Sequence, residues 1–361
     1  NNLEELHAVV SFVAHPTTLG SLQSFKMTYE TPILQGGVEG DKALKALKRK
    51  LSLILIRRTK AEIETLPDGK TRSDFVIGCH LNAYQRAEYN KHLVQTLRQF
   101  GDYGNIDNDC DKNDDNGRDN NVSSSSSSSS KAIQTQVLPA IQHMRKICNG
   151  TVQSDESSSK LRILQNLLKE IRSSSPGEKV VIVSNFTTVL DGVQKMVNGQ
   201  GWITLRLDGS TKQELRQGLV DRFSSNTDPA FIFLLSSKAG GMGLNLQRAS
   251  RLFMMDPDWN PATDLQAMAR ICRQGQTRNC FIYRFVCVST VEEAILHRQY
   301  YKRNIADSLL GSTSSSSSSS LAIESTRWIS DDDIENTVND ATNTTANASQ
   351  TDYGFKDTKG V

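Results

Sequence analysis

The chain has 361 residues, of which 37% are hydrophobic and 23% charged, and its mean hydropathy is −0.44. This length allows two domains, each with a hydrophobic core of its own. The sequence shows no signal peptide and no apolar run of membrane-spanning length, which argues against a membrane protein and favours an intracellular one. The six cysteines form no CxxC pair and no zinc-like spacing with histidine, so we expect free thiols and no metal site.

The net charge of +2 is unevenly distributed along the chain. Residues 160–310 carry 20 Lys and Arg against 13 Asp and Glu, a net charge of +7, whereas residues 102–121 and residues 311–361 each come to −5. A basic centre between acidic segments is typical of a chain whose central part contacts a polyanion. A solvated surface with a small excess of lysine is consistent with the same charges.

The N-terminal segments are expected to be helical. Residues 4–13 repeat apolar side chains at helical spacing, and because this pattern begins with the first residues, we expect the chain to continue a longer one. A short helix is expected over 22–29. Residues 41–58 alternate leucine with lysine, which fits either a DNA-facing helix or a solvated amphipathic one.

Gly69, Lys70 and Thr71 resemble the end of an ATP-binding P-loop, but the rest of that motif is absent. The pattern G-x-x-x-x-G-K-[ST] requires a glycine at the position of Glu64 and an apolar strand before the loop. No other GK[ST] occurs in the sequence, and no Asp-Glu pair follows an apolar strand. The sequence therefore predicts no P-loop of its own.

Residues 72–149 alternate between ordered and low-complexity sequence. Residues 75–79 are a weakly alternating candidate strand, and residues 81–100 a helix with its apolar side chains near one face. Residues 101–130 are rich in Asn and Asp and then in Ser, so we expect a disordered insertion. A helix should resume over 131–149.

From Lys160 onward, continuous apolar segments alternate with helical ones. This pattern predicts an α/β unit in which a parallel sheet is covered by helices on both faces. Residues 311–361 should be a largely disordered acidic tail, from which Trp328 and Ile329 could dock on the fold. The expected strands are 179–185, 202–209, 231–237, 251–256 and 279–286, and the expected helices are 161–172, 189–197, 212–223, 262–272 and 290–308.

Small or polar residues follow the ends of four expected strands. Ligands of parallel sheets bind at these carboxyl ends, where exposed backbone N–H groups and hydroxyls can hold phosphates. Ordinary turns use the same residue types, because glycine permits positive φ and serine caps helices. The residues concerned are Ser184, Asn185, Asp208, Gly209, Ser210, Ser236, Ser237, Lys238, Ala239, Gly240 and Asp256.

Gln266, Arg270 and Arg273 are spaced i, i+4 and i+7, so on a helix they would lie on one face. A guanidinium on a rigid helix can stabilise charge on a transferring γ-phosphoryl group, although a lone helical arginine is usually solvated. Trp259 follows a strand end and is either a buried anchor of its loop or an aromatic side chain directed towards a nucleic acid.

Together these motifs resemble the second motor lobe of the SWI/SNF-type ATPases of helicase superfamily two, double-stranded DNA translocases with two RecA-like lobes. The resemblance rests on FIFLLSSKAGGMGLNL, on RLFMMDPDWNPATDLQAMARICRQGQ and on STVEEAILHRQYYK. SSKAGG and MARICRQGQ are more similar to the recombination-repair branch, the Rad fifty-four-like proteins, than to chromatin remodellers. The resemblance covers residues 1–100 and 131–310.

The resemblance implies roles for individual residues. Arg270 and Arg273 would be catalytic arginine fingers supported by Gln266. The residues that would couple DNA contact to the nucleotide are Gly243, Leu244 and Asn245. The implied DNA contacts are Ser184, Asn185, Gly209, Ser210, Ser236, Ser237, Lys238, Ala239, Gly240 and, as a wedge, Trp259.

The sequence also departs from the family pattern. Asn149-Gly150-Thr151 stands where Asn-His-Pro is usual, which weakens the expectation of an ordered joint there. Cys272 stands where a larger aromatic residue or His is common, and Gln274 where an acidic residue or Ile is common. The first lobe, with its P-loop and its magnesium-binding acidic motif, has no counterpart in the sequence.

The implied organisation is the end of lobe one with a helical insertion (1–101), a disordered insertion (102–130), an inter-lobe helical segment (131–159), a RecA-like lobe (160–310) and an acidic tail (311–361). ATP and Mg²⁺ would be held mainly by the missing lobe, so this chain alone should be inactive. The expected partners are double-stranded DNA and a strand-exchange recombinase filament, in the nucleus and without membrane. The alternatives are a non-enzymatic DNA-binding or docking module and a chromatin-remodeller fragment.

Overall fold

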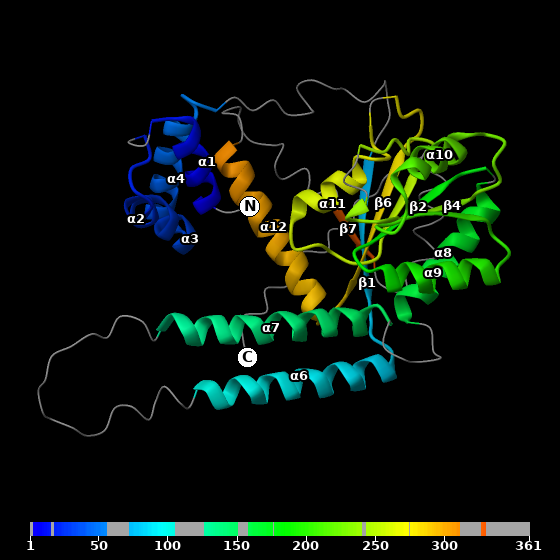
Figure 1. The fold of residues 1–361 in the computed structure, drawn as a ribbon, viewed down its shortest axis with the longest axis horizontal. Coiled ribbons are helices and arrows are strands. Elements are labelled where there is room, and N and C mark those ends of the chain that lie inside the picture. Colours follow the sequence, from blue (N-terminus) through cyan, green and yellow to red (C-terminus); the bar gives the residue numbers. More distant parts are fainter. Residues whose placement is uncertain are drawn as a thin grey trace, which may run out of the picture.

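The computed structural model describes residues 3–15, 18–55, 72–104, 126–150, 158–175, 177–239, 243–273, 275–310 and 326–329. Within these ranges a sheet with helices on both faces forms one half of the molecule (Figure 1). A helical bundle lies beside it, and the long helix α12 (Val291–Leu310) runs between the two. No helix in these ranges is both long and apolar enough to cross a membrane.

The strands of the sheet all pair in parallel, in the order β3-β4-β2-β5-β6-β1-β7. β2, β4 and β5 are buried along their whole length, as expected of strands covered on both faces. The predicted α/β class is therefore confirmed. The strands are β1 (Arg72–Cys79), β2 (Val180–Ser184), β3 (Thr204–Leu207), β4 (Ile232–Ser236), β5 (Arg251–Met254), β6 (Cys280–Cys287) and β7 (Thr326–Ile329).

Each face of the sheet carries its own hydrophobic core. The first core contains α8 (Ser159–Ser174) and α9 (Thr187–Gly199), together with Tyr89 and Met144 from two earlier helices. The second contains α10 (Gln213–Ser224) and α11 (Pro261–Met268). Val180 and Ile182 of β2 pack in the first core, whereas Val181 and Val183 pack in the second. Because successive strand residues point to opposite faces, the continuous apolar run of β2 serves both cores.

β1 is a full member of the sheet, although it lies in the 1–101 segment expected to belong to the end of lobe one. Arg72 is opposite Cys280 and Cys79 is opposite Cys287, so β1 pairs with the whole of β6. The strand expected over 75–79 is confirmed, although its five residues are all buried between flanking strands instead of alternating in exposure. On its other side β1 pairs with β7, which is how the segment with Trp328 and Ile329 docks.

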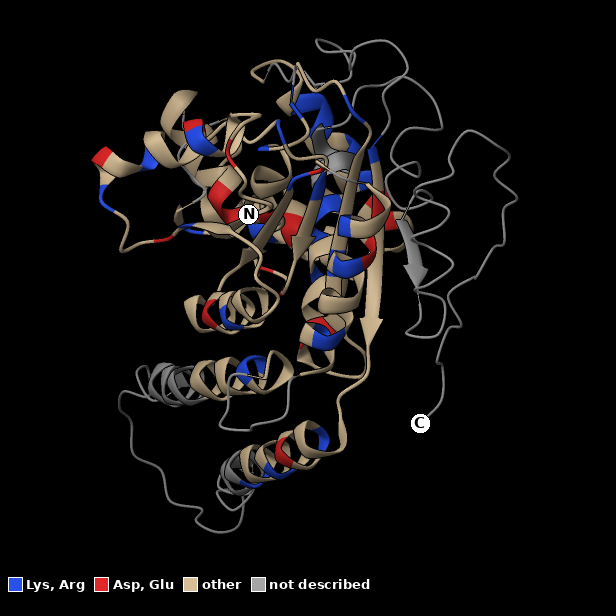
Figure 2. Cartoon of the chain, turned by 90° about the vertical axis from the view of Figure 1, so that its right-hand side faces the viewer, with Lys and Arg blue, Asp and Glu red and all other residues tan. Residues whose placement is uncertain are grey.

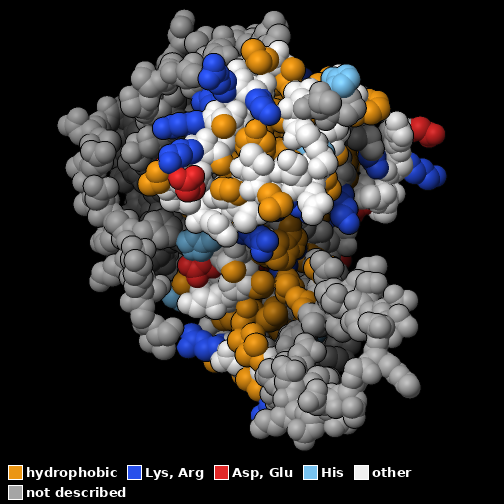
Figure 3. All heavy atoms as spheres, turned by 90° about the vertical axis from the view of Figure 1, so that its left-hand side faces the viewer, with side chains coloured by type: hydrophobic (Ala, Val, Ile, Leu, Met, Phe, Trp, Pro, Cys, Tyr) orange, Lys and Arg blue, Asp and Glu red, His pale blue; other side chains and the backbone are white. Residues whose placement is uncertain are grey.

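A small helical bundle precedes the sheet. Its helices are α1 (Leu3–Val13), α2 (Leu22–Phe25), the π-helix η1 (Lys26–Glu30), α3 (Thr31–Gln35) and α4 (Gly37–Leu51). Phe25 and Leu47 are fully buried at its centre, and Ile305 of α12 packs against the same core. Other large apolar side chains of the bundle remain exposed, among them Phe12 at 92% and Val13 at 75%, and hydrophobic groups gather on the face that Figure 3 shows.

Helices α6 (Ala83–Gly104) and α7 (Ser126–Cys148) form a hairpin that projects from the sheet (Figure 1). At its base Gln85 donates to the Ile147 carbonyl at 2.8 Å, and the Tyr89 hydroxyl accepts the Val291 N–H at 2.9 Å. The disorder expected over 101–130 is wrong at both ends, because residues 101–104 belong to α6 and residues 126–130 belong to α7. Each residue added to a formed helix gains one backbone hydrogen bond, which favours such extension. Residues 105–125 lie outside the described part of the chain.

Candidate functional site

The carboxyl ends of β2 and β5 are joined through Asp256. Its carboxylate accepts the Ser184 hydroxyl, the Asn185 N–H at 3.0 Å and the Asn185 side-chain amide at 2.6 Å. Arg145 of α7 lies 3.6 Å from the same carboxylate and donates to the Pro257 carbonyl at 2.5 Å. Ser184 is 1% exposed, so its hydroxyl is directed at Asp256 rather than at a ligand. Of the predicted pair, only the half-buried Asn185 offers a surface for DNA.

The turn after β3 is ordered around Asp208. The Asp208 carboxylate accepts the Ser210 N–H at 2.9 Å and the Ser210 hydroxyl at 2.6 Å, and it pairs with Arg206 at 2.8 Å. The hydrogen bond from the Ser210 hydroxyl, aided by Arg206, lowers the pKa of Asp208. Gly209 and Ser210 are exposed. The turn is therefore rigid and presents both residues at the sheet edge, as predicted.

The residues after β4 divide into buried and exposed groups. Ser236 and Ala239 are each 5% exposed, and Ala239 packs in the second core, so neither offers a contact surface for DNA. Ser237 is half-buried and donates its N–H to the Ser184 carbonyl at 3.0 Å. Lys238 is exposed, and no ion pair of it occurs among the described residues. Gly240 lies outside the described ranges. Figure 2 shows further Lys and Arg positions on the sheet unit.

The predicted coupling loop follows and is tied to the arginines by its backbone. Gly243 is exposed with φ of 42°, a left-handed conformation that favours glycine. Leu244 is buried and Asn245 exposed. The Leu246 N–H donates to the Arg270 carbonyl at 3.0 Å. A displacement of one segment must therefore move or break its contact with the other.

The helix that should carry the three catalytic residues is shorter than predicted. Asn260 caps its start by accepting the Ala262 N–H at 3.1 Å, and α11 ends at Met268 rather than Cys272. Only Gln266 lies on it, and it is exposed. Arg270 and Arg273 follow in a turn, where the Arg270 N–H bonds to Ala267 three residues back at 3.1 Å. The predicted common helical face is wrong, because the Arg270 carbonyl bonds to Leu246 instead of continuing the helix.

Arg270 and Arg273 nevertheless form a pair of neighbouring cations. Arg270 is half-buried, and its Nε is a buried donor without a partner. Burial lowers the pKa of Arg270, and the positive charge of Arg273 lowers it further. No acidic side chain pairs with either arginine within the described residues. The pair is therefore an uncompensated positive site, suited to an anion with several oxygens.

Gln276 is a structural residue of this site for which the sequence suggested no role. It is 1% exposed, and its amide nitrogen lies 3.0 Å from the carbonyl oxygens of Gln247, Ala249 and Ile271, which share its two N–H groups. Its oxygen accepts the Arg278 N–H at 3.1 Å. One side chain thus ties the coupling loop to the arginine turn. The sequence signal for this role was a glutamine directly after Gly275, because a glutamine side chain can both donate and accept hydrogen bonds and so join two backbone segments.

The loop with Trp259 is anchored on α12. Gln299 donates to the Asp258 carbonyl and, at 2.7 Å, to the Asp264 carboxylate, while Lys302 donates to the Trp259 carbonyl at 3.2 Å. Burial raises the pKa of Asp264 to about 7, against the opposing hydrogen bond from Gln299. Trp259 itself is half-buried, so an anchored loop still leaves part of the indole accessible.

A buried polar network holds the joint between α7 and α8. Lys160 pairs with Glu292 at 2.6 Å and donates to Asn149 at 3.1 Å and to the Met255 carbonyl at 2.7 Å. Burial alone would lower the pKa of Lys160, but the Glu292 carboxylate raises it. Asn149 is 2% exposed and also donates to Glu292 at 3.2 Å. The expected loosening at Asn149 is therefore wrong, whereas Thr151 lies outside the described residues.

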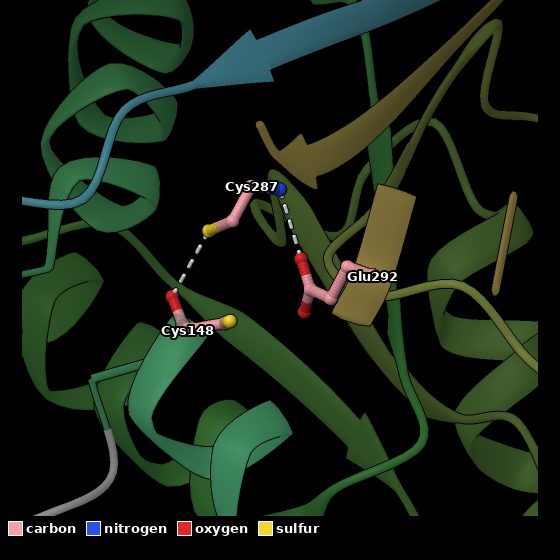
Figure 4. A group of neighbouring side chains, drawn as sticks. All are labelled: Cys148, Cys287 and Glu292. Atoms are coloured by element: carbon pink, nitrogen blue, oxygen red, sulfur yellow. Dashed lines mark hydrogen bonds between the residues drawn. The ribbon is translucent and has the colours of Figure 1, made fainter. Parts of the chain in front are cut away.

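Two thiols adjoin this network. Cys148, Cys287 and Glu292 bring two sulfurs and a carboxylate within 4.8 Å of one another (Figure 4). Such atoms are possible metal ligands, but the Lys160 ammonium already lies 2.8 and 2.6 Å from the two Glu292 oxygens and would repel a second cation. Burial raises the pKa of Cys287 and keeps its thiol protonated. The group fits a closed ion-pair network better than a metal site.

Comparison with known proteins identifies two family domains. Residues 1–152 match the SNF2-related domain, and residues 159–275 match the helicase conserved C-terminal domain. The parallel sheet and its edge fit this assignment, and the chain belongs to the SNF2-related members of helicase superfamily two.

Its curated relatives carry names of one branch. The chain is 35% identical over 346 residues to the DNA repair protein rhp54 of Schizosaccharomyces pombe, covering 85% of this chain and 37% of that one. It is 35% identical over 336 residues to the DNA repair and recombination protein RAD54 of Saccharomyces cerevisiae (85% and 35%) and 34% identical over 363 residues to RAD54B of Gallus gallus (91% and 38%). The chain is thus a Rad54-like member, and it spans well under half the length of these relatives.

A similar solved structure is that of the C-terminal part of the Fun30 ATPase domain. The sequence identity is 23%, the TM-score is 0.48, and the match covers 75% of this chain and 97% of that one.

Proposed function

We propose that this chain is the C-terminal half of an ATP-dependent translocase that acts on double-stranded DNA in repair by homologous recombination. The observation that carries the proposal is the pair of Arg270 and Arg273, two adjacent cations without an acidic partner in the described part of the chain. The pair lies in a turn that is hydrogen-bonded, through the Arg270 carbonyl and the Leu246 N–H, to the loop that follows Lys238 in the chain. The names of the relatives supply the context of repair and recombination.

The arginines fit the γ-phosphate of ATP. A guanidinium at this position stabilises the charge that develops during phosphoryl transfer, an effect of about 10³–10⁵ in kcat. Gln266, exposed on α11 one turn before Arg270, would support the pair. Mg²⁺ does not fit this edge, because the carboxylates of Asp208 and Asp256 are already bonded to neighbouring side chains. A first lobe outside these 361 residues would therefore hold the metal ion, together with most of the nucleotide.

The DNA backbone would bind along the sheet edge. Lys238 supplies the charge, and the exposed Gly209 and Ser210 supply hydrogen bonds together with the accessible parts of the half-buried Asn185 and Ser237. The hydrogen bond between Leu246 and Arg270 gives a short route by which a change at the nucleotide displaces this edge. A recombinase filament as partner and the nucleus as location belong to the same proposal and rest on the names of the relatives.

The test combines this chain with a separately purified first lobe from a Rad54-like relative. The chain alone should not hydrolyse ATP, and the mixture should do so when double-stranded DNA is added. Arg270→Ala should reduce the turnover of the mixture at least about 10³-fold. Arg278→Ala is the matched control, because this exposed arginine lies nearby in the same connection to β6 and should leave turnover unchanged.

Steady DNA-stimulated hydrolysis by the chain alone would contradict the proposal that a separate first lobe is needed to bind the nucleotide and the metal ion. Full turnover of the Arg270→Ala mixture would show that the arginine pair does not reach the nucleotide. DNA binding that needs neither arginine nor nucleotide, without any turnover in the mixture, would favour a non-enzymatic module.

A further inference from the structure

Arg145 lies in the last turn of α7, beside the strand ends that form the proposed DNA edge. We infer that it is a positioning residue, which holds the Asn185 side chain in place for a phosphate of the DNA backbone. Arg145 touches no DNA itself, because its side chain is only 4% exposed. The inference rests on the proposed function and deepens it, since it assigns a role in DNA binding to a buried residue behind the edge.

The Asp256 carboxylate joins Arg145 to Asn185. Its Oδ1 atom accepts the Asn185 N–H at 3.0 Å and the Asn185 side-chain amide at 2.6 Å. Arg145 Nη2 lies 3.6 Å from the same oxygen, which is the separation of an ion pair rather than of a hydrogen bond. The Asp256 side chain is fully buried, and Arg145 is the only cation that pairs with it in the described part of the chain. The carboxylate therefore depends on Arg145 for charge compensation, and the direction of Asn185 depends on the carboxylate.

Arg145 also contacts the residues that follow Asp256 and Asn185 in the chain. It donates to the Pro257 carbonyl at 2.5 Å, and its guanidinium lies over the Phe186 ring at 4.9 Å from the ring centre. A planar guanidinium can make both contacts at once, because it donates in its plane and stacks with its face. One side chain thus holds the ends of β2 and β5 together directly behind Asn185.

The position of Arg145 is fixed by the base of the α6–α7 hairpin. The Asn149 side chain donates to the Arg145 carbonyl at 2.9 Å, and Gln85 of α6 donates to the Ile147 carbonyl at 2.8 Å. The Arg145 Nε atom is buried and has no hydrogen-bond partner among the described residues. The guanidinium is therefore held through Nη2 and through its stacking on Phe186. A displacement of α7 must then change the contacts behind Asn185.

Asn185 retains the capacity to bind a ligand while it is held in this way. It is half-buried, and its side-chain amide has two N–H groups, of which the bond to Asp256 uses one. The second N–H can donate to a phosphate oxygen, a contact that orients a protein on DNA without reading its sequence. Removal of Arg145 leaves the buried Asp256 charge uncompensated, so the carboxylate seeks other donors and the Asn185 amide loses its fixed direction.

The test is a double-mutant cycle in the full chain, with binding to a fluorescent DNA duplex measured by anisotropy. Asn185→Ala should weaken binding by about tenfold, as expected for one hydrogen bond to a charged group. Arg145→Met should also weaken binding by about tenfold in the parent chain. In the Asn185→Ala background it should weaken binding by only about twofold, because no amide is left to position.

The matched control is Lys146→Met, which removes one exposed positive charge from the next residue of the same helix. It measures the effect of charge alone, which we expect to be about twofold in both backgrounds. Circular dichroism melts establish that each variant is folded at the assay temperature. If Arg145→Met does not fold, Arg145→Lys replaces it in the cycle, because lysine keeps the charge but not the planar fork, and its effect of about threefold should again require Asn185.

A second readout needs no DNA. In ¹⁵N-labelled protein, Arg145→Met should accelerate hydrogen exchange of the Asn185 N–H by about tenfold. The Ser210 N–H is the internal reference, because it is bonded to Asp208 in the neighbouring turn at 2.9 Å and should exchange at an unchanged rate. A general loss of stability would instead accelerate exchange at both positions.

The outcomes separate the inference from the proposed function. An equal loss of affinity from Arg145→Met in both backgrounds would overturn the inference, as would equal acceleration of exchange at Asn185 and Ser210. Parent-like binding by Asn185→Ala would overturn it too, because Asn185 would then contact no phosphate. A parent chain that binds no duplex would contradict the proposed function, whereas the exchange experiment would still show whether Arg145 holds Asn185.

Discussion

Replacement of Lys160 by methionine tests the energetics of the buried joint. The Lys160 ammonium is fully buried and pairs with Glu292 at 2.6 Å, with two further acceptors at Asn149 and Met255. Its removal leaves a buried carboxylate whose remaining partners are the Asn149 amide and the Cys287 N–H. Loss of one partner of a buried ion pair costs about 3–5 kcal/mol. We expect Lys160→Met to lower the free energy of unfolding by that amount.

Urea unfolding followed by circular dichroism measures this loss. The double variant Lys160→Met with Glu292→Leu should recover much of it, because no uncompensated charge is then buried. Lys195→Met, on the exposed side of α9, is the matched control and should change stability by less than about 0.5 kcal/mol. A loss below about 1 kcal/mol in the single variant would refute the reasoning, as would a double variant less stable than the single one.

Three further predictions concern the sheet edge and its support. Lys238→Ala should reduce the slope of log K for duplex DNA against log salt by about 0.9, whereas Lys195→Ala should not; an unchanged slope in fluorescence anisotropy would exclude a phosphate contact of Lys238. Asp264 has its pKa raised to about 7, so the folded state binds its proton more tightly than the unfolded state does. Stability should therefore fall as pH rises from about 4 to about 7, by up to about 4 kcal/mol, and Asp264→Asn should remove this part of the pH dependence in urea titrations. Gln276→Ala should lower the free energy of unfolding by about 2–3 kcal/mol, because the buried carbonyls of Ala249 and Ile271 lose their donor. The exposed Gln217→Ala should lower it by only about 0.5 kcal/mol, and equal losses in thermal melts would contradict the role of Gln276.

The alternation of apolar and helical segments was sufficient to predict most of the sheet. The apolar runs around Val181 and Phe233 are local, and each corresponds to a buried strand. The position of β1 could not be predicted in this way, because its partner Cys280 follows Arg72 by 208 residues. The end of α11 was likewise not predictable, since it depends on a hydrogen bond between Leu246 and Arg270 that no periodicity encodes.

The sequence predicted which turns lie at the sheet edge, but it did not predict which side chains of those turns are exposed. Asn185, Ser210 and Lys238 lie at the sheet edge with exposed surface, as strand ends in parallel sheets predict. Ser184 and Ser236 occur in the same turns but are buried, because their hydroxyl groups lie at the last residues of buried strands. Sequence spacing locates a turn, whereas the direction of each side chain depends on the strands packed around it.

The pairing of β1 with β6 has a consequence for biosynthesis. Residues 72–79 leave the ribosome long before residues 280–287, and at about 5–20 residues per second the intervening chain takes roughly 10–40 s to translate. During that time β1 has no β6 to pair with, and its apolar residues need either temporary contacts or a chaperone. Completion of the sheet therefore follows synthesis of β6, so we expect truncation before Cys280 to yield a chain that aggregates rather than a smaller folded unit.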